Sequence, residues 1–595
     1  MFFGRRNRRQ KKSTMVLSAA LATVVGLAPM APAYADKGGV HDTATPIQHV
    51  IIIVGENRTF DNVFGGYQPK KGQSVMNLLS EGVINADGTA GPNFGNAQQQ
   101  QANDTGTYSI NPTKTGPYLT LPQPDTTYAF GQTPNIPDPR FPANLPNGPF
   151  QISKYTAYQG AFTGDPVHRF FQMWQDYDEG KLDLFTWVGE TIGTGSNGNP
   201  VPFNTHQGGV SMGFFNMSQG DAPVFKFIAD NYAMSDNYHQ AIMGGTGANF
   251  IFLGTADEAF YGDGNGNPLT PPVNQIENPD PVASTNNWYT QDGYSGGSYV
   301  NCADSGQHGV APIKSYLSTL GVRPNCDSGH YYLVNNYGPA YQANGQPVDT
   351  TLHPFTLPPQ TLPNLAQALS GVGVSWRYYE GGYNGGNATS AWCSICNPFQ
   401  FIGPVVNNPN LHKNFADVSD FYQDLAKGNL PAVSWIRPYE NYAGHPADST
   451  LDWYENFIAA IANAVINNRE LFESTAILVT TDEGGGYYDS GYIQPVDFFG
   501  DGTRIPLMII SPYVKAGNID HTYYDHGSII KFIEENWGIG TLSGRSRDNL
   551  PNPIASPSNA YMPANGPAIG DLMNMFDFKH KRNVKDAPLI IAGGI

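Results

Sequence analysis

The feature that most restricts the fold of this chain is an apolar segment near its start that leads directly into acidic and amide residues. Residues 47–54 are apolar apart from Gln48 and His49 and are rich in β-branched side chains, which is typical of a strand inside a parallel sheet. Helical patterns separate it from similar apolar segments at 372–378, 433–436, 476–481 and 505–510. Strands that alternate with helices predict an α/β fold with a doubly wound, mostly parallel sheet.

The length of the chain allows two kinds of domain organisation. At about 150 residues per domain, 595 residues would form three or four domains, but one large α/β domain with long insertions fits the same length. Residues 84–150 and 260–360 are rich in Gly, Asn and Pro, a composition typical of surface loops. We therefore expect one domain over 36–595 with loop-rich insertions at these two places, the second of which could cover the active site.

Residues 1–35 have the form of a secretory signal. A start with six basic residues precedes an apolar run over 15–27 and the small-x-small sequence Ala33-Tyr34-Ala35. The run is too short to span a bilayer and remain there, although a short membrane anchor is the alternative. Paired arginines also permit export by the twin-arginine route. The sequence thus predicts a secreted or periplasmic protein without stable membrane insertion.

The charge of the chain restricts the classes of partner. Six of the 32 basic residues and none of the 50 acidic residues lie in the signal segment, so the rest of the chain has a net charge of −24. Such a surface repels nucleic acid and anionic membranes. We therefore expect no nucleic-acid partner, and an anionic substrate must be attracted by a local site such as a metal ion. Nothing in the sequence indicates the oligomeric state.

Four cysteines in an exported chain favour disulfides, and four cysteines allow three pairings. The pairing that we favour joins Cys302 to Cys326 and Cys393 to Cys396. The Cys-x-x-Cys sequence at 393–396 could instead be redox-active or bind zinc. Redox motifs normally begin a helix, and zinc would need further ligands nearby, so we expect a structural bridge.

Acidic and amide residues follow two of the predicted strands. Residues 47–54 lead into Glu56 and Asn57, and residues 476–481 lead into Asp482, Glu483 and three glycines. Ligands in open parallel sheets bind beyond the carboxyl ends of the strands, and hard oxygen donors suit Mg²⁺, Ca²⁺ or Mn²⁺. The alternative is that these acids cap helices or turns.

A third segment surrounds one threonine with small residues. Gly244, Gly245 and Gly247 leave the hydroxyl of Thr246 accessible, and a helix after it would direct its N-terminus at an anion. A threonine hydroxyl becomes a good nucleophile when a metal or a base lowers its pKa. Without other information, Gly-Gly-Thr-Gly is a turn in most proteins.

Five phrases, in the order in which they occur, resemble the bacterial phosphoesterase family. That family contains phosphatidylcholine-hydrolysing phospholipases C and secreted acid phosphatases, and it belongs to the alkaline-phosphatase-like superfamily. The likeness runs from about residue 46 to about residue 578, and the ordered set is more specific than any single phrase. The phrases are Glu56-Asn57-Arg58-Thr59-Phe60-Asp61, Gly245-Thr246-Gly247-Ala248-Asn249, Asp482-Glu483-Gly484-Gly485-Gly486-Tyr487-Tyr488-Asp489, Arg504-Ile505-Pro506 and Ile510-Ser511-Pro512-Tyr513.

The resemblance implies a role for each matching residue. Thr246 matches the nucleophile and also contacts the metal, and Asn249 matches an amide that binds a phosphate oxygen. The resemblance also places Asn57 among the residues that bind the substrate. The resemblance implies one divalent metal ion, whose identity (Mg, Ca, Mn or Zn) is open. Besides Thr246, the ligands of this ion are Glu56, Asn57, Asp482 and Glu483.

Four histidines are candidates for contact with phosphate. His168, in Asp165-Pro166-x-His168, and His445, before Pro446, resemble family histidines that face the phosphate. His330 and His526 are weaker candidates, for which a structural role is an equal alternative. Many relatives carry histidine after the Tyr-Asp that follows the glycines, whereas this chain has Ser490, which puts the substrate class in doubt more than the mechanism.

The resemblance implies an exported, metal-dependent phosphoric-ester hydrolase with a phosphoesterase catalytic domain. Thr246 would attack phosphorus and form a phosphothreonine, which water then hydrolyses. We favour an acid phosphatase acting on phosphomonoesters. The alternatives are a phospholipase C acting on phosphatidylcholine-type diesters and an exported binding protein without turnover.

Overall fold

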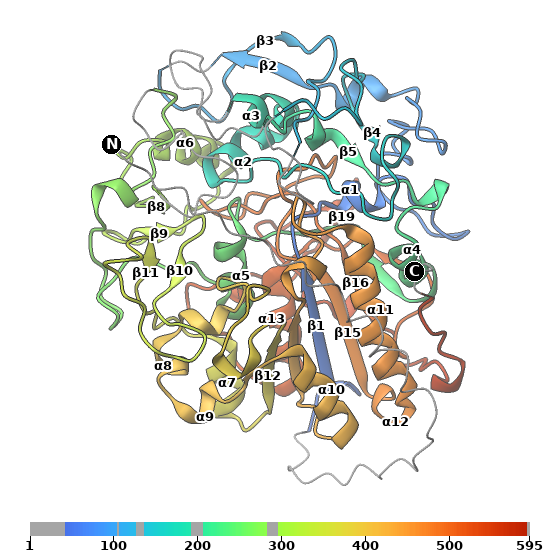
Figure 1. The fold of residues 1–595 in the computed structure, drawn as a ribbon, viewed down its shortest axis with the longest axis vertical. Helices are drawn as coiled ribbons and strands as arrows, with labels where there is room; N and C mark the ends of the chain where they lie inside the picture. Colours follow the sequence, from blue (N-terminus) through green and yellow to red (C-terminus); the bar gives the residue numbers. More distant parts are fainter. Residues whose placement is uncertain (1–41, 104–105, 127–135, 192–205, 283–295, 592–595) are drawn as a thin grey trace, which may run out of the picture. The chain divides into compact units, whose positions relative to one another are not determined.

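A central sheet of eight strands organises the fold (Figure 1). In the computed structural model, residues 42–591 are described except 104–105, 127–135, 192–205 and 283–295. The predicted signal at 1–35 lies outside the described residues. In spatial order the strands are β13 (Phe415–Ala416), β12 (Trp376–Glu380), β14 (Val433–Arg437), β1 (His49–Gly55), β15 (Thr475–Thr481), β16 (Leu507–Ile510), β6 (Ala233–Ser235) and β17 (Asn518–Asp520).

The sheet is mostly parallel. β1 pairs in parallel with β14 on one side and with β15 on the other, and β12 continues the parallel order beyond β14. Only β16 runs antiparallel to its neighbours in this sheet, β15 and β6. All seven residues of β15 are buried, as a strand covered on both faces requires. The predicted α/β class with a mostly parallel sheet is confirmed.

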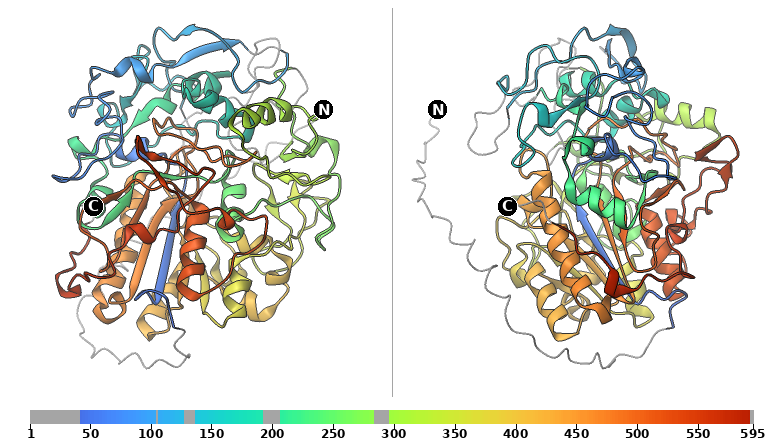
Figure 2. Two further views of the ribbon diagram at one scale, coloured as in Figure 1. Left: turned by 180° about the vertical axis from the view of Figure 1, so that it is seen from behind. Right: turned by 90° about the vertical axis from the view of Figure 1, so that its right-hand side faces the viewer.

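Helices cover both faces of the sheet, which makes the fold doubly wound (Figures 1 and 2). One face carries α11 (Leu451–Asn467) and α12 (Arg469–Phe472), and α11 also contacts α4 (Pro223–Asn231). The other face carries α13 (His526–Trp537), which packs against α5 (Thr246–Thr255). The predicted apolar face of α11 is buried, and it consists of Ile458, Ile461, Ala462, Val465 and Ile466.

The strand predicted at 372–378 begins four residues later than the sequence pattern predicts, and β16 begins two residues after the predicted start at 505. The apolar run at 372–378 predicts a single strand, but β12 begins at Trp376. Val372 instead follows the last turn of α7 (Leu365–Gly371), and Gly373 reverses the chain with a positive φ of 79°. The glycine at this position therefore ends the helix before the strand can start.

The carboxyl ends of β1, β14 and β15 point toward a part of the molecule with short elements (Figures 1 and 2). The antiparallel pair β2 (Gln100–Asn103) and β3 (Thr113–Pro117) lies there, together with α2 (Phe170–Tyr177) and α3 (Phe185–Thr191). Between residues 296 and 360 the elements are β8 (Tyr299–Val300), α6 (Val310–Leu320), β9 (Tyr332–Leu333), β10 (Gly338–Pro339) and β11 (Thr356–Leu357). The division into one domain with two insertions stays a prediction.

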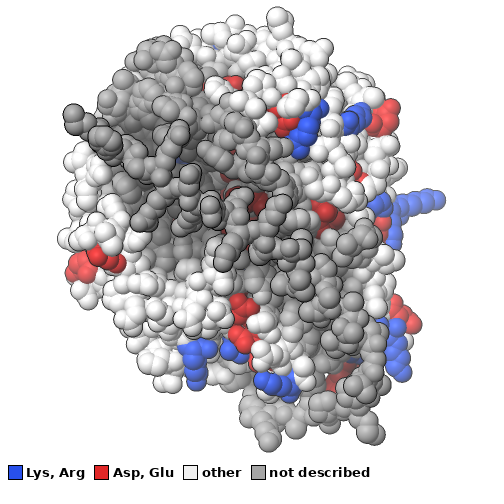
Figure 3. Space-filling view, viewed as in Figure 1, with Lys and Arg blue, Asp and Glu red and all other residues white. Residues whose placement is uncertain are grey.

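Among the residues that the structure describes, no helix has both the length and the apolar character needed to cross a bilayer. On the face shown in Figure 3, the acidic and basic side chains form small separate groups. The remaining α-helices are α1 (Phe60–Phe64), α8 (Gly403–Val406), α9 (Pro409–His412) and α10 (Val418–Lys427).

Candidate active site

The pairing of β1 with β15 brings the two acidic motifs together. Gly55 and Thr481, the last residues of the two strands, are partners in the parallel register, so Glu56 and Asp482 follow at adjacent positions. The backbone N–H of Asn57 donates to Asp482 Oδ1 at 3.1 Å, and the backbone N–H of Glu483 donates to the same oxygen at 2.8 Å. The sheet thus gathers the four positions predicted as metal ligands at one edge.

The backbone at this edge is tightly packed. Asn57 has a left-handed φ of 59°, and Gly485 has a φ of 64°. A Cβ atom at position 485 would lie 2.7 Å from Cβ of Asn57, so only glycine fits at this point. The amide nitrogen of Asn57 donates to Asp165 Oδ1 at 3.2 Å, while its Oδ1 has no hydrogen-bond partner among the described residues. That oxygen remains available to a ligand.

Asp165 lies between the two principal histidine candidates. Its carboxylate oxygens are 3.9 Å from His168 Nδ1 and 3.8 Å from His445 Nε2. His168 Nδ1 is bonded to the carbonyl of Pro166 at 2.8 Å, and its Nε2 lies 3.6 Å from Glu483 Oε1. We call one group of residues at this edge the sheet-end cluster: Asn57, Asp165, Asp482 and Glu483. The structure therefore brings both histidines to the edge that holds the predicted ligands.

The two histidines differ in the protonation that their surroundings favour. Complete burial lowers the pKa of His168, because the charged imidazolium loses its hydration. Burial also acts on His445, but the carboxylates of Asp165 and Glu56 outweigh it and raise the pKa of His445 to about 10. At neutral pH the site thus holds a neutral imidazole at 168 and an imidazolium at 445.

Thr246 begins helix α5, in agreement with the sequence pattern. Its side chain is buried, and its hydroxyl lies near Asp482, where it partly offsets the rise in the pKa of that carboxyl. The next backbone N–H, that of Gly247, donates to Asn336 Oδ1 at 2.6 Å. Asn336 therefore holds the first turn of the helix that presents Thr246.

The amide of Asn249 is bonded to the loop before Thr246. Its Oδ1 accepts from the N–H of Ile242 at 3.0 Å, and its Nδ2 donates to the carbonyls of Ile242 and Gly244 at 3.1 and 3.0 Å. These contacts fix the position of the threonine. Direct contact between Asn249 and phosphate stays a prediction.

Two carboxyl groups of the site have a raised pKa. Burial, followed by the charge of Glu56, raises the pKa of Asp482 to about 8. Burial also raises the pKa of Glu56, although Arg437 acts in the opposite direction. Buried acids with raised pKa values bind a cation favourably, because the cation restores the ionised form. With the free oxygen of Asn57, these donors suit a hard divalent ion.

The carboxylate of Glu56 is turned toward Arg437, the last residue of β14. Arg437 forms a short ion pair with Glu56 and a second, at 2.8 Å, with Glu440. Among the described residues, the one group of potential ligands that lies within 4.8 Å of one another is Glu56, Cys393 and Cys396. The predicted ligands thus share an edge of the sheet, but their carboxylates do not converge on one point in this structure.

Both predicted disulfides are present, Cys302–Cys326 and Cys393–Cys396. The sulfur of Cys396 lies 3.1 Å from Glu56 Oε1, so the second bridge is in contact with the site. Oxidised sulfur is not a thiolate ligand, and the interpretation as a structural bridge holds over zinc binding.

The two weaker histidine candidates lie in different surroundings. The ring of His330 packs against Phe260 and Tyr332, at centroid distances of 4.6 and 5.8 Å, rather than beside the sheet-end cluster. His526 is buried, with Nε2 at 2.5 Å from the carbonyl oxygen of Asp482 and Nδ1 at 2.8 Å from the hydroxyl of Tyr238. His526 therefore supports the backbone of a predicted ligand, whereas His330 is not gathered with the others.

A second group of buried charges adjoins the site, and it explains the surroundings of Ser490. Arg504 donates to both oxygens of Asp489, at 2.8 and 3.1 Å, and to Asp61 at 3.3 Å. The N–H and the hydroxyl of Ser490 both donate to Asp61, at 2.8 and 2.6 Å. We call Asp61, Asp489, Ser490 and Arg504 the Arg504 network. At position 490 this chain thus has a hydroxyl bonded within that network.

Sequence reasoning does not assign roles to Asp165, Asn336 or Arg437. Asp165 and Arg437 both occur in phrases whose neighbouring histidines are the stronger signal. Their partners in the site are distant in the chain, since Arg437 is 381 residues from Glu56 and Asn336 is 89 residues from Gly247. For Arg437, the one signal available in the sequence is an arginine directly after the apolar run at 433–436.

Comparisons with known proteins find a family model and several relatives that match this chain. A family model described as the Phosphoesterase family matches residues 47–540. Hemolytic phospholipase C of Pseudomonas aeruginosa is 24% identical over 328 residues, which cover 47% of this chain and 40% of that protein. Phospholipase C B of Mycobacterium tuberculosis is 22% identical over 527 residues, which cover 83% of this chain and 74% of that protein.

A smaller relative carries a different activity in its name. The probable acid phosphatase of Kluyveromyces lactis is 26% identical over 221 residues, which cover 34% of this chain and 49% of that protein. The matched part of this chain therefore spans less than half the length of the hemolytic phospholipase C and of this phosphatase.

Proposed function

This chain belongs to the Phosphoesterase family, and on that premise we propose that it hydrolyses phosphoric esters with Thr246 as the nucleophile. The observation that carries the proposal is the position of the Thr246 hydroxyl. It lies at the start of α5 beside Asp482, at the end of β15. A hydroxyl, two buried acids and an imidazolium at one sheet edge suit attack on a phosphorus atom.

A divalent ion would be held by Glu56, Asn57, Asp482 and Glu483, with Thr246 next to it. When bound, such an ion stabilises an ionised hydroxyl and the negative charge that develops on the phosphoryl oxygens. The raised pKa of Asp482 and the free oxygen of Asn57 support this assignment. Glu56 would have to turn away from Arg437 in part to complete the set.

The chain's own residues supply the remaining chemistry. Thr246 Oγ forms a bond to phosphorus, the bond from phosphorus to the alcohol oxygen breaks, and the alcohol leaves with a proton. Water then attacks the phosphothreonine, which releases inorganic phosphate and restores the hydroxyl. The imidazolium of His445, held by Asp165, would donate to a phosphoryl oxygen, and Asn249 would keep Thr246 in position.

We favour phosphomonoesters as substrates. The net charge of −24 after the predicted signal disfavours binding to anionic membrane surfaces, and one relative is named a probable acid phosphatase. The relatives named phospholipase C favour the second candidate, a diesterase acting on phosphatidylcholine-type lipids. A non-catalytic exported protein is the third alternative, against which the intact nucleophile and acids argue. Two disulfides support export to a secreted or periplasmic location.

A matched pair of variants tests the nucleophile. Thr246→Val keeps the shape of the side chain and removes the hydroxyl, so turnover of a phosphomonoester should fall about a thousandfold or more. Thr246→Ser keeps the oxygen and should retain part of the rate. Acid quench during turnover, followed by peptide mass spectrometry, should detect phosphate on the peptide that contains Thr246. An active Thr246→Val enzyme without such a phosphopeptide would overturn the assignment.

A further inference from the structure

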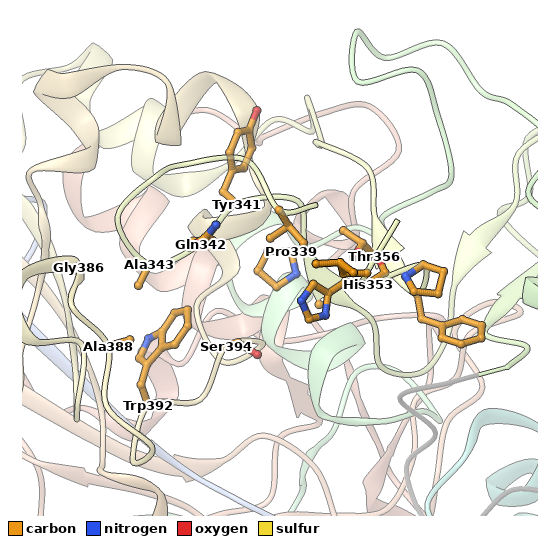
Figure 4. A pocket seen from close by; sticks show the side chains of 15 residues that line it. Pro339, Tyr341, Gln342, Ala343, His353, Thr356, Gly386, Ala388, Trp392 and Ser394 are labelled. Atoms are coloured by element: carbon orange, nitrogen blue, oxygen red, sulfur yellow. Dashed lines mark hydrogen bonds between the residues drawn. The ribbon is translucent and has the colours of Figure 1, made fainter. Parts of the chain in front are cut away.

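A pocket of about 580 Å³ lies in the part of the molecule that includes β10 and β11 (Figure 4). Two segments of the chain line it, residues 338–356 and residues 386–394. In Figure 4, the indole of Trp392 lies on one side, and Pro339 and His353 lie on the other. A volume of several hundred Å³ is typical of sites for small molecules.

The first lining segment is joined to the nucleophile loop. Asn336 holds the N–H of Gly247, next to Thr246, and β10 begins only two residues later at Gly338. Gly338 and Pro339 are the first residues of the pocket wall. Residues 336–339 therefore contact the loop of the nucleophile at one end and line the pocket at the other.

The second lining segment is joined to the predicted metal ligand. Ser394 lies between the bridged cysteines, and the sulfur of Cys396 contacts Glu56 at 3.1 Å. The carbonyl of Ala391, next to Trp392, accepts from the N–H of Glu440, whose carboxylate pairs with Arg437. In each wall, a lining residue is thus two residues away from one that contacts the active site: Gly338 from Asn336, and Ser394 from Cys396.

The pocket lining contains no Asp, Glu, Lys or Arg among the described residues. Its aromatic members are Tyr341, Phe355 and Trp392, and its aliphatic side chains include Val348 and Leu352. Flat aromatic faces bind rings well, and a lining without carboxylates disfavours a cationic group, which would lose hydration without gaining a counter-charge. A quaternary ammonium group is the competing occupant, because it also binds aromatic faces, but it finds no carboxylate in this lining.

We propose that this pocket binds the alcohol part of the substrate and selects an uncharged ring, while the phosphoryl group lies at Thr246. This inference rests on the proposed function and adds a substrate class to it. The ring could belong to an aromatic alcohol or to a neutral sugar, since both present a flat face to Trp392.

The test compares phosphomonoesters that differ only in the alcohol. Phenyl phosphate and a hexose phosphate carry a neutral ring, methyl phosphate has no ring, and the alcohol part of choline phosphate is cationic. Trp392→Ala should lower kcat/KM about tenfold for the better of the two ring substrates and leave methyl phosphate within about twofold. Tyr422→Ala, at an exposed aromatic on α10 outside the lining, is the matched control.

A second variant protects the test against misfolding at Trp392. Leu352 is 73% exposed, so Leu352→Asp adds a charge to the pocket with little risk to folding. It should lower kcat/KM for the ring substrates and raise the relative rate on choline phosphate. Equal losses on all four substrates, or a wild-type preference for choline phosphate or methyl phosphate, would overturn the proposal.

Binding measurements separate this proposal from the proposed function. Calorimetry with phenylphosphonate and methylphosphonate needs no turnover and applies equally to Thr246→Ala. Phenylphosphonate should bind more tightly than methylphosphonate, and Trp392→Ala should remove the difference. Absence of turnover with this binding pattern would contradict the hydrolase alone. Equal binding of the two phosphonates would contradict the pocket assignment alone.

Discussion

The sheet-end cluster and the Arg504 network both take acidic or amide residues from the same two stretches of sequence. Residues 56–61 contribute Asn57 to the first region and Asp61 to the second, and residues 482–489 contribute Asp482 and Asp489 in the same way. Both regions are buried and acidic. They differ in their partners, because Arg504 meets both Asp489 oxygens while the cluster has no arginine bonded to Asp482 among the described residues.

This difference separates a structural charge from a functional one. In the Arg504 network the positive partner belongs to the protein, so the acids are neutralised when the chain folds. In the sheet-end cluster no arginine is bonded to Asp482 among the described residues, and burial raises the pKa of this acid to about 8, so a bound cation would supply its positive partner. Equal substitutions in the two regions should therefore have opposite consequences.

The largest effect is expected for activity in Asp482→Asn. The variant amide can still accept from the N–H groups of Asn57 and Glu483, so folding should persist. Loss of the charged ligand should lower turnover about a thousandfold and reduce the metal content. Thermal unfolding of the metal-free variant should occur no earlier than that of metal-free wild type. Full activity with normal metal content would remove Asp482 from the site.

Asp489→Asn should reverse this pattern. The change leaves Arg504 buried without its main counter-charge, and breaking a buried ion pair costs about 3 to 5 kcal/mol. Denaturant unfolding should show this loss, while the folded fraction should keep its metal and most of its turnover per molecule. A loss of turnover larger than the loss of folded protein would place Asp489 in the functional region.

The pH dependence of stability provides a third test. Burial and the charge of Asp489 raise the pKa of Asp61 to about 7, although Arg504 acts against them. A carboxyl with a raised pKa stabilises the folded state most below its ordinary pKa, and this contribution is lost as pH rises toward 7. Relative to Asp61→Asn, the unfolding free energy of wild type should fall by roughly 3 kcal/mol between pH 4 and pH 7. A difference that rises with pH would show that Arg504, and not burial, dominates the titration of Asp61.

The smallest effect is expected for Ser490→Ala. Its hydroxyl donates to Asp61 at 2.6 Å, and loss of one such bond costs about 1 kcal/mol. Denaturant unfolding near pH 7 should show this loss, and turnover should change by less than about twofold. If turnover falls more than tenfold with normal stability, Ser490 acts in the active site.

Most of the fold could be predicted from apolar patterns along the chain. The run before Glu56 and the run before Asp482 are strands because their β-branched residues are buried on both faces of the sheet. The prediction is wrong at Val372 because apolar residues at the end of a helix and at the start of a strand form one continuous run. Only the positive φ of Gly373 separates them, and an apolar pattern does not contain that information.

The sequence predicts which residues lie at the edge of the sheet in the candidate site. It does not predict which side chains contact one another there. The order of strands places Glu56 next to Asp482, as two motifs after adjacent parallel strands require. The pairing of Glu56 with Arg437 and the link from Asp165 to Asn57 depend on side chains far apart in the chain. The sequence separates Asp482 from Asp489 only by position, since Asp482 directly follows a predicted strand, and it does not show that Asp489 pairs with Arg504.

The contact between the Cys393–Cys396 bridge and Glu56 affects how the protein should be prepared in the laboratory. Reducing agents in a purification buffer, or expression in a reducing cytosol, would convert the bridge into two thiols close to a carboxylate. Sulfur donors favour zinc over magnesium or calcium. A reduced sample would therefore bind zinc from the buffer at Cys393, Cys396 and Glu56, where the oxidised protein has no thiolate. Elemental analysis of such a sample would detect this zinc and not the metal of the native site. Metal identification should be made on material that has been kept oxidised throughout.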